Sequence, residues 1–389
     1  MSNNFKILYC TGSISVKGGT ERVLANKSKI FAERLGIDIH IATLSDPTIK
    51  AYEFSNKIHF HHIFIEYKKS KYIPTLISNH FYKKKLYQKY AKVIQEINPN
   101  LVIVLERGTD DFYLPKICKE LNIPIIREFH FARNAVKEKA KIIQSIKERL
   151  LYKLAYKRIF RAFNNYDYLV LLTKRDQIEG NYKTKTVVIP NIVPTSVHKA
   201  NTLSSKIMIS VGSMNDKRKG FPDIIRAWKI IQDTHPKWTL KIYGDGAERV
   251  DLETLVQNLK LENSVYICGA SSSIEQKYCE SAFFISASVA EGLPMVLIEA
   301  MGCGLPCVAY DCPTGPSDII MDKENGYLVP FKNVSALADA IEQMINKDSN
   351  REYMSKKAIK TAQLYSEENI IPLWQDFFSK FGYINETNN

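Results

Sequence analysis

Short apolar runs and longer amphipathic runs alternate along nearly the whole chain, and this alternation limits the possible folds more than any other feature. Such alternation is typical of parallel α/β sheets, in which a helix connects each strand to the next. In the first half the predicted strands are Lys6–Cys10, Ile37–Leu44, Ile58–Ile63, Leu101–Leu105, Ile123–Glu128, Tyr168–Leu172 and Thr186–Ile189. In the second half they are Ile207–Val211, Thr239–Tyr243, Val265–Cys268, Phe283–Ser286, Pro306–Ala309 and Tyr327–Val329.

A polar stretch from Ile189 to Lys206 separates these two series of strands. It contains Pro190, Asn191 and Pro194, which are residues typical of turns and linkers. With 389 residues, 45% of them hydrophobic, the chain is long enough to bury two cores. We therefore expect two consecutive α/β units rather than one large sheet. Helices in the first unit are predicted near 20–35, 80–97, 110–121 and 137–164.

The segment 290–304, AEGLPMVLIEAMGCG, is the most informative motif. Glu291 and Gly292 follow directly after the apolar run 282–289. Pro294 is suited to the first turn of a helix, where its missing N–H is not needed. The start of this helix presents free backbone N–H groups and a positive dipole end beside Glu291. Such an arrangement favours a bound phosphate.

Glu299 lies further along the same predicted helix, and its side chain leans back toward the helix start. From there its carboxylate can accept hydrogen bonds from a vicinal diol, such as the 2′ and 3′ hydroxyls of a ribose. A lone pair of glutamates with this spacing is more often a surface feature. The strand, glycine turn, proline and helix that enclose Glu291 and Glu299 favour a binding site.

Glycines and cations after other strands indicate further contacts to an anion. Gly18 and Gly19 precede a helix, where glycine lets the backbone approach a ligand closely, although their spacing is not that of a nicotinamide-type site. Lys217, Arg218 and Lys219 follow a strand of the second unit. There Arg218 can bind phosphate oxygens in bidentate fashion and Lys219 can act as a point charge. Alone, each motif is more often an ordinary turn.

Two single residues complete the set of candidates. Gly269 follows a predicted strand and suggests a close approach of the backbone to a planar base. His130 follows another strand, between Arg127 and Arg133, at the strand end where open α/β sheets bind ligands. A lone histidine is usually structural, but this position makes His130 the best candidate for a polar contact to a reacting sugar.

Charge is unevenly divided between the two halves. Residues 1–200 carry 35 Lys and Arg against 17 Asp and Glu, a net charge of +18, and residues 201–389 carry 19 against 24, a net charge of −5. The basic first half predicts an anionic partner, which is a nucleic acid, a lipid headgroup or a phosphorylated substrate.

Two basic segments of the first half favour association with an anionic membrane surface over a merely solvated surface. The predicted helix from Lys137 to Phe163 holds nine Lys or Arg against two Glu. Its apolar positions are Ile142, Ile143, Ile146, Leu150, Leu154 and Ile159. The second basic segment, Lys68–Lys71 and Lys83–Lys89, is interleaved with Tyr67, Tyr72, Tyr82, Tyr87 and Tyr90.

Several kinds of site and segment are not expected. No apolar run is long enough to span a membrane, and the N-terminus MSNNFKILYC lacks the features of a signal peptide, so we predict a cytoplasmic protein. The seven cysteines are scattered, and the C-x3-C pair Cys303 and Cys307 has no second pair to complete a zinc site. We predict free thiols. No DxD motif is present, so neither a metal nor another cofactor is expected.

Together these motifs resemble family 4 of the retaining glycosyltransferases. GGTERVLAN at 18–26 is similar to the family's first glycine loop and helix, and VVIPNIV at 187–193 to the segment that enters the second domain. VGSMNDKRKGF at 211–221 resembles its phosphate-binding stretch. The most specific resemblance is SVAEGLPMVLIEAMGCGLPCVAYDCPTGPSDII at 288–320, followed by NGYLV at 325–329.

The resemblance implies the GT-B fold, in which two Rossmann-like α/β domains face each other across a central cleft. Residues 1–190 would form the acceptor-side domain and residues 191–365 the nucleotide-sugar domain. Residues 366–389 would form a C-terminal helix that returns to the first domain. The implied reaction is transfer of a sugar from a nucleotide-sugar, most often a UDP-sugar, with retention of the anomeric configuration.

The resemblance also implies a role for each candidate residue. Glu291 would contact the donor sugar, and His130 would contact the same sugar near its reacting carbon. Glu299 would bind the ribose hydroxyls and Lys219 the diphosphate. Many family members have Arg where Ser213 stands, and Arg218 is expected to supply that charge instead. The complete predicted donor site is Gly18, Gly19, Arg218, Lys219, Gly269, Glu291, Gly292, Leu293, Pro294, Met295, Val296 and Glu299.

We thus predict a hexosyl- or hexosaminyltransferase that extends a lipid-linked or cell-surface glycan, peripherally bound to the inner face of the cytoplasmic membrane. Its partners would be a nucleotide-sugar, a glycan or lipid-linked acceptor and the anionic membrane surface. The rivals are a sucrose-type or phosphorylase-like enzyme acting on soluble sugars, and a non-catalytic nucleotide- or sugar-binding protein. A nucleic-acid-binding protein is suggested by charge alone, because no recognised nucleic-acid module is present.

Overall fold

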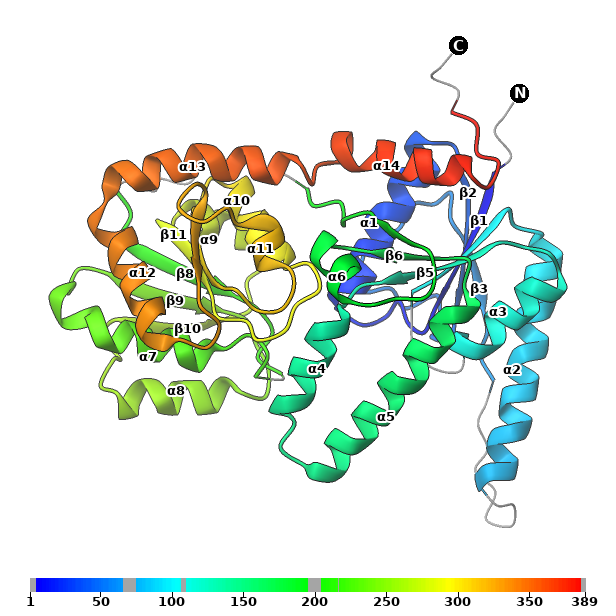
Figure 1. The fold of residues 1–389 in the computed structure, drawn as a ribbon, viewed down its shortest axis with the longest axis horizontal. Helices are drawn as coiled ribbons and strands as arrows, with labels where there is room; N and C mark the ends of the chain where they lie inside the picture. The colour runs from blue at the N-terminus through cyan, green and yellow to red at the C-terminus, as the bar shows by residue number, and fades with distance from the viewer. Residues whose placement is uncertain (1–4, 66–74, 106–109, 195–203, 216, 386–389) are drawn as a thin grey trace.

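The structure is a computed structural model that describes residues 5–65, 75–105, 110–194, 204–215 and 217–385. The predicted basic segment Lys68–Lys71 with Tyr67 and Tyr72, half of the predicted linker and the last residues of the tail lie outside the described residues. The described chain forms two parallel sheets, each covered by helices on both faces (Figure 1).

The first sheet has seven strands in the order β3-β2-β1-β4-β5-β6-β7. Its strands are β1 (Lys6–Thr11), β2 (Asp38–Thr43), β3 (His59–His62), β4 (Leu101–Val104), β5 (Ile125–Phe129), β6 (Tyr168–Leu171) and β7 (Thr186–Val188). All neighbouring strands run parallel. Every residue of the central strands β4 and β5 is buried, because helices exclude water from both faces of the sheet.

Helices of the first domain cover both faces of this sheet. They are α1 (Gly19–Arg34), α2 (Thr75–Ile97), α3 (Asp110–Glu120), α4 (Arg133–Ile142), α5 (Ile146–Ala162) and α6 (Lys174–Glu179). Residues of α1 pack into the core on one face, whereas α2, α3 and α5 contribute to the core on the other face.

The second sheet has six parallel strands in the order β10-β9-β8-β11-β12-β13. Its strands are β8 (Ile207–Val211), β9 (Thr239–Tyr243), β10 (Val265–Gly269), β11 (Phe283–Ser286), β12 (Cys307–Tyr310) and β13 (Gly326–Val329). The helices are α7 (Phe221–Ile231), α8 (Arg249–Asn258), α9 (Ile274–Cys279), α10 (Met295–Gly302), α11 (Pro316–Ile319) and α12 (Val334–Asn346). Short 3-10 turns follow α5 at Phe163–Asn165 and α7 at Gln232–Thr234.

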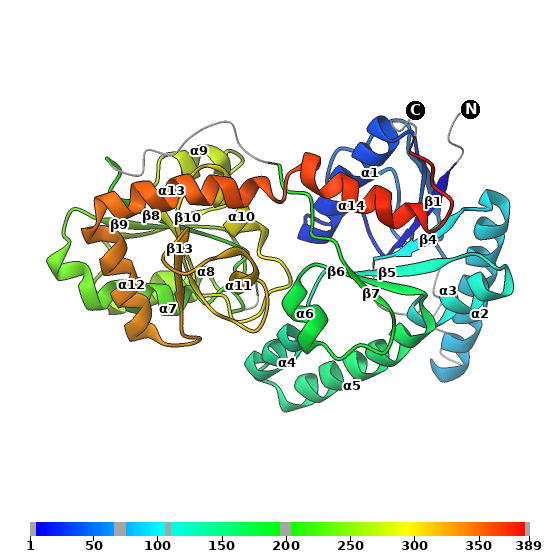
Figure 2. The same ribbon diagram turned by 45° about the horizontal axis from the view of Figure 1, so that its top comes forward.

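The last two helices connect the two domains. Helix α13 (Asp348–Gln363) packs against α10 of the second domain, and α14 (Glu367–Ser379) then lies over the first sheet (Figure 2). Trp374 and Phe378 of α14 pack on Phe31 of α1, with ring centroids 5.7 and 5.3 Å from that ring. The predicted return of the C-terminal helix to the first domain is confirmed.

All predicted strands are present, with ends shifted by at most two residues. The α/β class with two parallel sheets is therefore confirmed, while the exact domain boundaries 1–190, 191–365 and 366–389 stay predictions. The seven cysteines are free, and five of them are buried. None of the described helices is long and apolar enough to cross a bilayer.

The prediction of one continuous helix over 137–164 is wrong. The chain breaks after Ile142, and α5 begins anew at Ile146. Ser145 caps α5, since its Oγ accepts from the Glu148 N–H at 3.3 Å, and the Arg149 guanidinium donates to the Ile143 carbonyl across the corner. The Ser-x-x-Glu pattern at 145–148 is a capping signal, but the apolar residues continue at helical spacing across it and therefore predicted one helix.

Candidate active site

A cavity of about 470 Å³ lies between the two domains. Its first-domain wall comes from the start of α1, the end of β5 and the following turn. Its second-domain wall comes from the loops after β8 and β11. Ten of the predicted site residues line the cavity. Gly19 and His130 lie on the first-domain wall, and the second-domain wall holds Arg218, Lys219, Glu291, Gly292, Leu293, Pro294, Met295 and Val296. The sequence motifs thus meet in one cleft, as the parallel strand ends require.

Glu291 is the buried carboxylate at the centre of the second-domain wall. Its Oε1 lies 2.7 Å from Lys219 Nζ, and its Oε2 lies 2.8 Å from Arg218 Nη1. Burial alone would raise the pKa of the Glu291 carboxyl, but Arg218 and Lys219 outweigh it and lower the pKa to about 2. The site therefore holds one ionised acid between two cations that face the cleft.

The loop after β12 fixes the main chain around Glu291. Thr314 Oγ1 donates to the carbonyl of Glu291 at 2.6 Å. Gly315 has φ +98°, and a Cβ there would lie 2.5 Å from Pro294 Cδ. Because only glycine fits this backbone and this space, the segment PTGPSD supports the turn that presents Glu291.

Helix α10 begins one residue later than predicted. Pro294 is the N-cap, with ψ 85°, and Met295 is the first helical residue. The first backbone N–H groups of a helix have no partner within it, so this end carries partial positive charge. It lies in the cleft wall beside Glu291, as the sequence predicted.

His130 stands on the opposite wall, just after β5. Its Nε2–H donates to Glu128 Oε2 at 3.1 Å, and the same carboxylate is paired with the buried Lys27 ammonium. Burial raises the pKa of Glu128, but Lys27 and His130 outweigh this effect and hold the pKa below its usual value. Lys27 in turn lies 4.6 Å from the ring centroid of Trp374 in α14.

Gly292 lies directly against the opposite wall. A Cβ on Gly292 would lie 2.5 Å from the carbonyl oxygen of His130 and 3.0 Å from Phe131 Cα. Any other residue would push the domains apart at this point. Gly292 is therefore needed for the close contact between the two domains as well as for the turn after Glu291.

Glu299 does not line the cavity, and its carboxylate is paired with the guanidinium of Arg22 from α1. The side chain of Glu299 is 16% exposed and that of Arg22 is 38% exposed. Arg22 does line the cavity, so this ion pair joins the donor-side helix α10 to the first domain. Sequence reasoning assigned Arg22 no role, although it stands in the GGTER motif that the resemblance used.

Two other candidates lie apart from the cavity lining. Gly18 is the N-cap of α1, and Gly269 ends β10 with φ +73°, where a Cβ would lie 3.1 Å from Arg249 Nη1. Donor contacts at both glycines stay predictions. Arg133 donates to the carbonyls of Gly180 and Asn181 and thereby ties α4 to the loop after α6.

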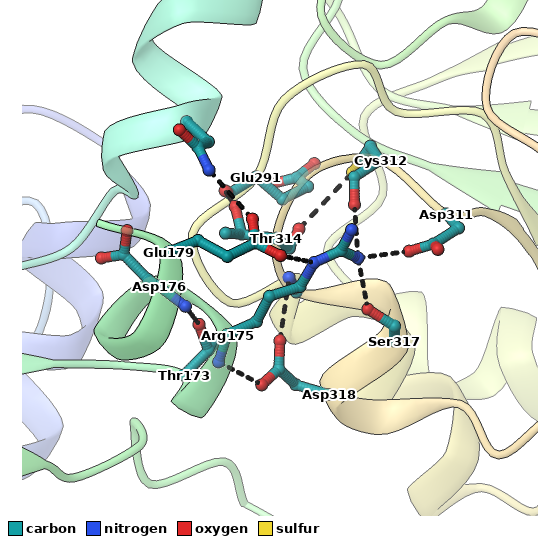
Figure 3. A network of polar contacts seen from close by, with 12 residues as sticks. Thr173, Arg175, Asp176, Glu179, Glu291, Asp311, Cys312, Thr314, Ser317 and Asp318 are labelled. Atoms are coloured by element: carbon teal, nitrogen blue, oxygen red, sulfur yellow. Dashed lines mark hydrogen bonds and ion pairs between the residues drawn. The ribbon is translucent and has the colours of Figure 1, made fainter. Parts of the chain in front are cut away.

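A second polar network crosses between the domains at Arg175 of α6 (Figure 3). Its Nη1 lies 2.6 Å from Asp311 Oδ1 and 2.7 Å from Ser317 Oγ, both in the second domain. Its backbone N–H donates to Asp318 at 3.2 Å. Sequence reasoning missed Arg175, because α6 forms no motif by itself, although the partners of Arg175 lie in the segment 288–320 that carries the resemblance.

Within the part of the chain that the structure describes, no cluster of three or more His, Cys, Asp or Glu is arranged to hold a metal ion. Arg218, Lys219 and the start of α10 are groups beside Glu291 that can face an anion in the cleft.

Comparison with known proteins shows which proteins this chain is similar to. Residues 196–361 match the family model described as glycosyl transferases group 1. An uncharacterized glycosyltransferase of Haemophilus influenzae is 27% identical over 374 residues, which cover 95% of this chain and 99% of that protein. The chain is a glycosyltransferase. The amylovoran biosynthesis glycosyltransferase AmsD of Erwinia amylovora is 31% identical over 54% of this chain and 62% of its own length.

Solved structures identify the fold of this glycosyltransferase as GT-B. Sucrose-phosphate synthase from Thermosynechococcus elongatus superposes with a TM-score of 0.77 at 19% identity, covering 97% of this chain and 99% of that one. A mutant of TarM from S. aureus, in complex with fondaparinux, alpha-GlcNAc-glycerol and UDP, superposes with a TM-score of 0.73 at 17% identity, covering 96% and 99%. The predicted GT-B architecture is confirmed.

Proposed function

We propose that this glycosyltransferase moves a hexosyl or hexosaminyl unit from a UDP-sugar to a growing glycan, with retention of the anomeric configuration. The observation that carries the proposal is the placement of Glu291, Arg218 and Lys219 at the start of α10, opposite His130 across one cleft. Cations, helix amides, a buried acid and a histidine converge there on a space suited to a nucleotide-sugar.

The diphosphate leaving group explains why Arg218 and Lys219 lie in the cleft. When the bond between sugar and diphosphate breaks, negative charge develops on the diphosphate oxygens, and preorganised positive groups stabilise that charge. We expect Arg218 and Lys219 to exchange part of their contact with Glu291 for the donor phosphates. Glu291 would then accept hydrogen bonds from sugar hydroxyls, and Glu299 from the ribose.

The acceptor side is assigned to the first domain. His130 would contact the donor sugar near its reacting carbon, and the acceptor hydroxyl would attack from the same face that the diphosphate leaves. A donor phosphate oxygen would take the acceptor's proton. The tight approach of Gly292 to His130 supports a reaction in a space closed to water, which suppresses hydrolysis of the donor.

The choice of donor and product draws on relatives of this chain. The TarM complex contains UDP and a GlcNAc-bearing compound, and AmsD is named for amylovoran biosynthesis. These names support a UDP-sugar donor and a glycan product. We further propose that the reaction needs no metal or other cofactor, because Arg218 and Lys219 supply positive charge at the diphosphate.

We also propose that the acceptor is lipid-linked or part of a cell-surface glycan, and that the enzyme binds the inner face of the cytoplasmic membrane. The support is the net charge of the first half and the exposed cations of α4 and α5. Co-sedimentation with vesicles tests this part, and equal recovery with neutral and anionic vesicles would refute it. Full activity on soluble sugars without lipid would instead favour the sucrose-type or phosphorylase-like alternative.

The donor proposal is tested by a thermal-shift screen of nucleotide-sugars followed by assays of UDP release. Lys219→Gln removes one of the two cations that contact Glu291, while Lys217→Gln is a matched control in the same loop. We expect kcat/KM to fall by roughly a hundredfold or more in Lys219→Gln, since one preorganised electrostatic group is often worth that much. The control should stay near wild type. Equal activity of both variants, or no stabilisation by any UDP-sugar, would refute the proposal.

A further inference from the structure

A second cavity, of about 670 Å³, lies in the first domain between α4, α5 and the segment 181–184. The two helices form a hairpin that projects from the body of the domain (Figure 1). The cavity is separate from the cleft, but Tyr156 of α5 contributes to the walls of both. Neither the sequence motifs nor the proposed transfer reaction makes use of this cavity, which we call the hairpin groove.

The floor of the hairpin groove is apolar and aromatic. It is formed by Val136, Ala140, Tyr152, Tyr156, Phe160 and Phe163. The ring centroids of Tyr152 and Tyr156 are 4.6 Å apart, and those of Tyr156 and Phe160 are 5.7 Å apart, so the rings form a continuous wall along α5. Such a surface suits a hydrocarbon chain, since burial of apolar area is the main source of affinity for such ligands.

The rim of the hairpin groove is cationic. Its basic residues are Lys137, Lys141, Lys153, Lys157, Arg161 and Lys183, all of which are exposed. Among the described residues that line the groove, none is Asp or Glu. Lys141 is paired with the nearby Glu138, but Lys153 and Lys157 extend the rim along α5. The occupant that complements this charge is an anion with an apolar part.

The outer face of α5 carries a second, independent feature. Ile146, Leu150 and Leu154 follow one another at four-residue spacing on one side of the helix and are 81%, 58% and 54% exposed. All three belong to the apolar positions of the predicted helix from Lys137 to Phe163, and the structure leaves them in contact with solvent. An exposed apolar stripe beside many cations is typical of a helix that lies in a membrane interface.

We propose that the hairpin groove binds an anionic phospholipid of the bilayer. The acyl chain would lie on the aromatic floor, the phosphate would face Lys153 and Lys157, and the outer stripe of α5 would enter the headgroup region. Specific lipid capture of this kind goes beyond the proposed transfer reaction and beyond attraction to a charged surface. It would hold the acceptor side of the cleft at the membrane, because α4 and α5 border both cavities.

Short-chain lipids below their micelle concentration test capture without a membrane. Dihexanoyl phosphatidylglycerol, dihexanoyl phosphatidylcholine and glycerol phosphate are titrated into the full chain by calorimetry. We expect the anionic lipid to bind at least about tenfold more tightly than the zwitterionic lipid, because basic residues at the rim favour an anionic headgroup. Glycerol phosphate, which lacks the chain, should not bind measurably.

The rim is tested with Lys153→Ala/Lys157→Ala, and Lys237→Ala/Lys360→Ala is the matched control of equal charge change on the second domain. The rim variant should lose about tenfold or more in affinity for the anionic lipid at an unchanged melting temperature, while the control keeps wild-type binding. Similar binding of glycerol phosphate and the lipid would mean attraction to charge alone and would overturn the proposal. Wild-type lipid binding in the rim variant, or no binding of the anionic lipid by the wild type, would also overturn the proposal. Stabilisation by UDP-sugars is measured separately, so failure here leaves the transfer reaction untouched.

Discussion

Arg22 and Glu299 form an ion pair that joins the first helix of one domain to the donor-side helix of the other. The acid that the sequence assigned to a ribose therefore already has a cationic partner across the cleft. A carboxylate has room for several donors, so Arg22 and a ribose diol can share Glu299. Arg22 would then orient this acid and link nucleotide binding to closure of the two domains.

A double-mutant cycle of Arg22→Ala and Glu299→Ala measures this link. We expect Arg22→Ala to raise the Kd of UDP less than about fivefold, because a partly exposed ion pair contributes little. Glu299→Ala should raise it by about tenfold or more, since two hydrogen bonds to a charged acceptor are lost. Calorimetry on the four proteins gives the coupling. A larger effect of Arg22→Ala than of Glu299→Ala would contradict this assignment.

The Arg175 network predicts a change in domain closure. Arg175→Ala removes the donor to Asp311 and Ser317 and should lower kcat/KM by roughly five- to thirtyfold, since loss of charged hydrogen bonds of this kind costs about 1–2 kcal/mol. The radius of gyration from X-ray scattering should increase, because the domains separate more often. Arg226→Ala breaks an ion pair within α7 and is the control of equal charge change. Identical scattering of all three proteins would rule out a closing role for Arg175.

The low pKa of Glu291 predicts a loss of stability in acid. Its pKa is about 2 in the folded protein against 4.5 for a free glutamate, so the unfolded chain binds the proton more readily between these values. Ionised Glu291 therefore adds about 3 kcal/mol to the free energy of unfolding above pH 4.5. This contribution is lost as the pH falls from 4.5 toward 2.

Urea unfolding of wild type and Glu291→Gln at a series of pH values measures this contribution. The variant should be less stable than wild type at pH 7, because Arg218 and Lys219 lose their buried partner, and the difference should shrink below pH 4.5. Glu262→Gln, at an exposed position, is the control and should follow the wild-type curve. A constant difference between Glu291→Gln and wild type from pH 7 to pH 3 would disprove the assignment of the low pKa.

The fold was predictable because parallel strands buried on both faces leave continuous apolar runs in the sequence. β8, β9 and β11 begin and end where these runs do. The break between α4 and α5 was missed, since Ile142, Ile143 and Ile146 continue a helical apolar pattern across it. The break is stabilised by the capping Ser145 and by a hydrogen bond from Arg149 to the Ile143 carbonyl, and neither interaction alters the apolar pattern.

The location of a residue in the cleft was predictable where polar side chains follow the ends of strands, as at Glu291, Lys219 and His130. It was not predictable where a residue acts across the domain boundary. Nothing in the segment around Arg22, Arg175 or Gly292 shows which part of the other domain will face it. Such pairs depend on how two separately folded sheets dock, and that information is distributed over many residues.

The last prediction concerns the orientation of His130 by Glu128. The carboxylate accepts from His130 Nε2 at 3.1 Å and is itself held by Lys27, which packs on Trp374 of the returning helix. Glu128→Gln keeps an acceptor but loses the charge that fixes the ring. We expect kcat to fall by about tenfold to a hundredfold, as is common when the partner of a functional histidine is changed, with little change in the KM of the donor.

A loss of activity in Glu128→Gln alone is ambiguous, because the change also leaves Lys27 as a buried charge without its acid. The double variant Lys27→Met/Glu128→Gln removes both charges, and replacement of a buried ion pair by neutral groups often restores stability. We therefore expect the double variant to regain a melting temperature near that of wild type while its kcat stays low. If kcat recovered together with stability, Glu128 would only stabilise the core, and His130 would keep its orientation without the Glu128 carboxylate.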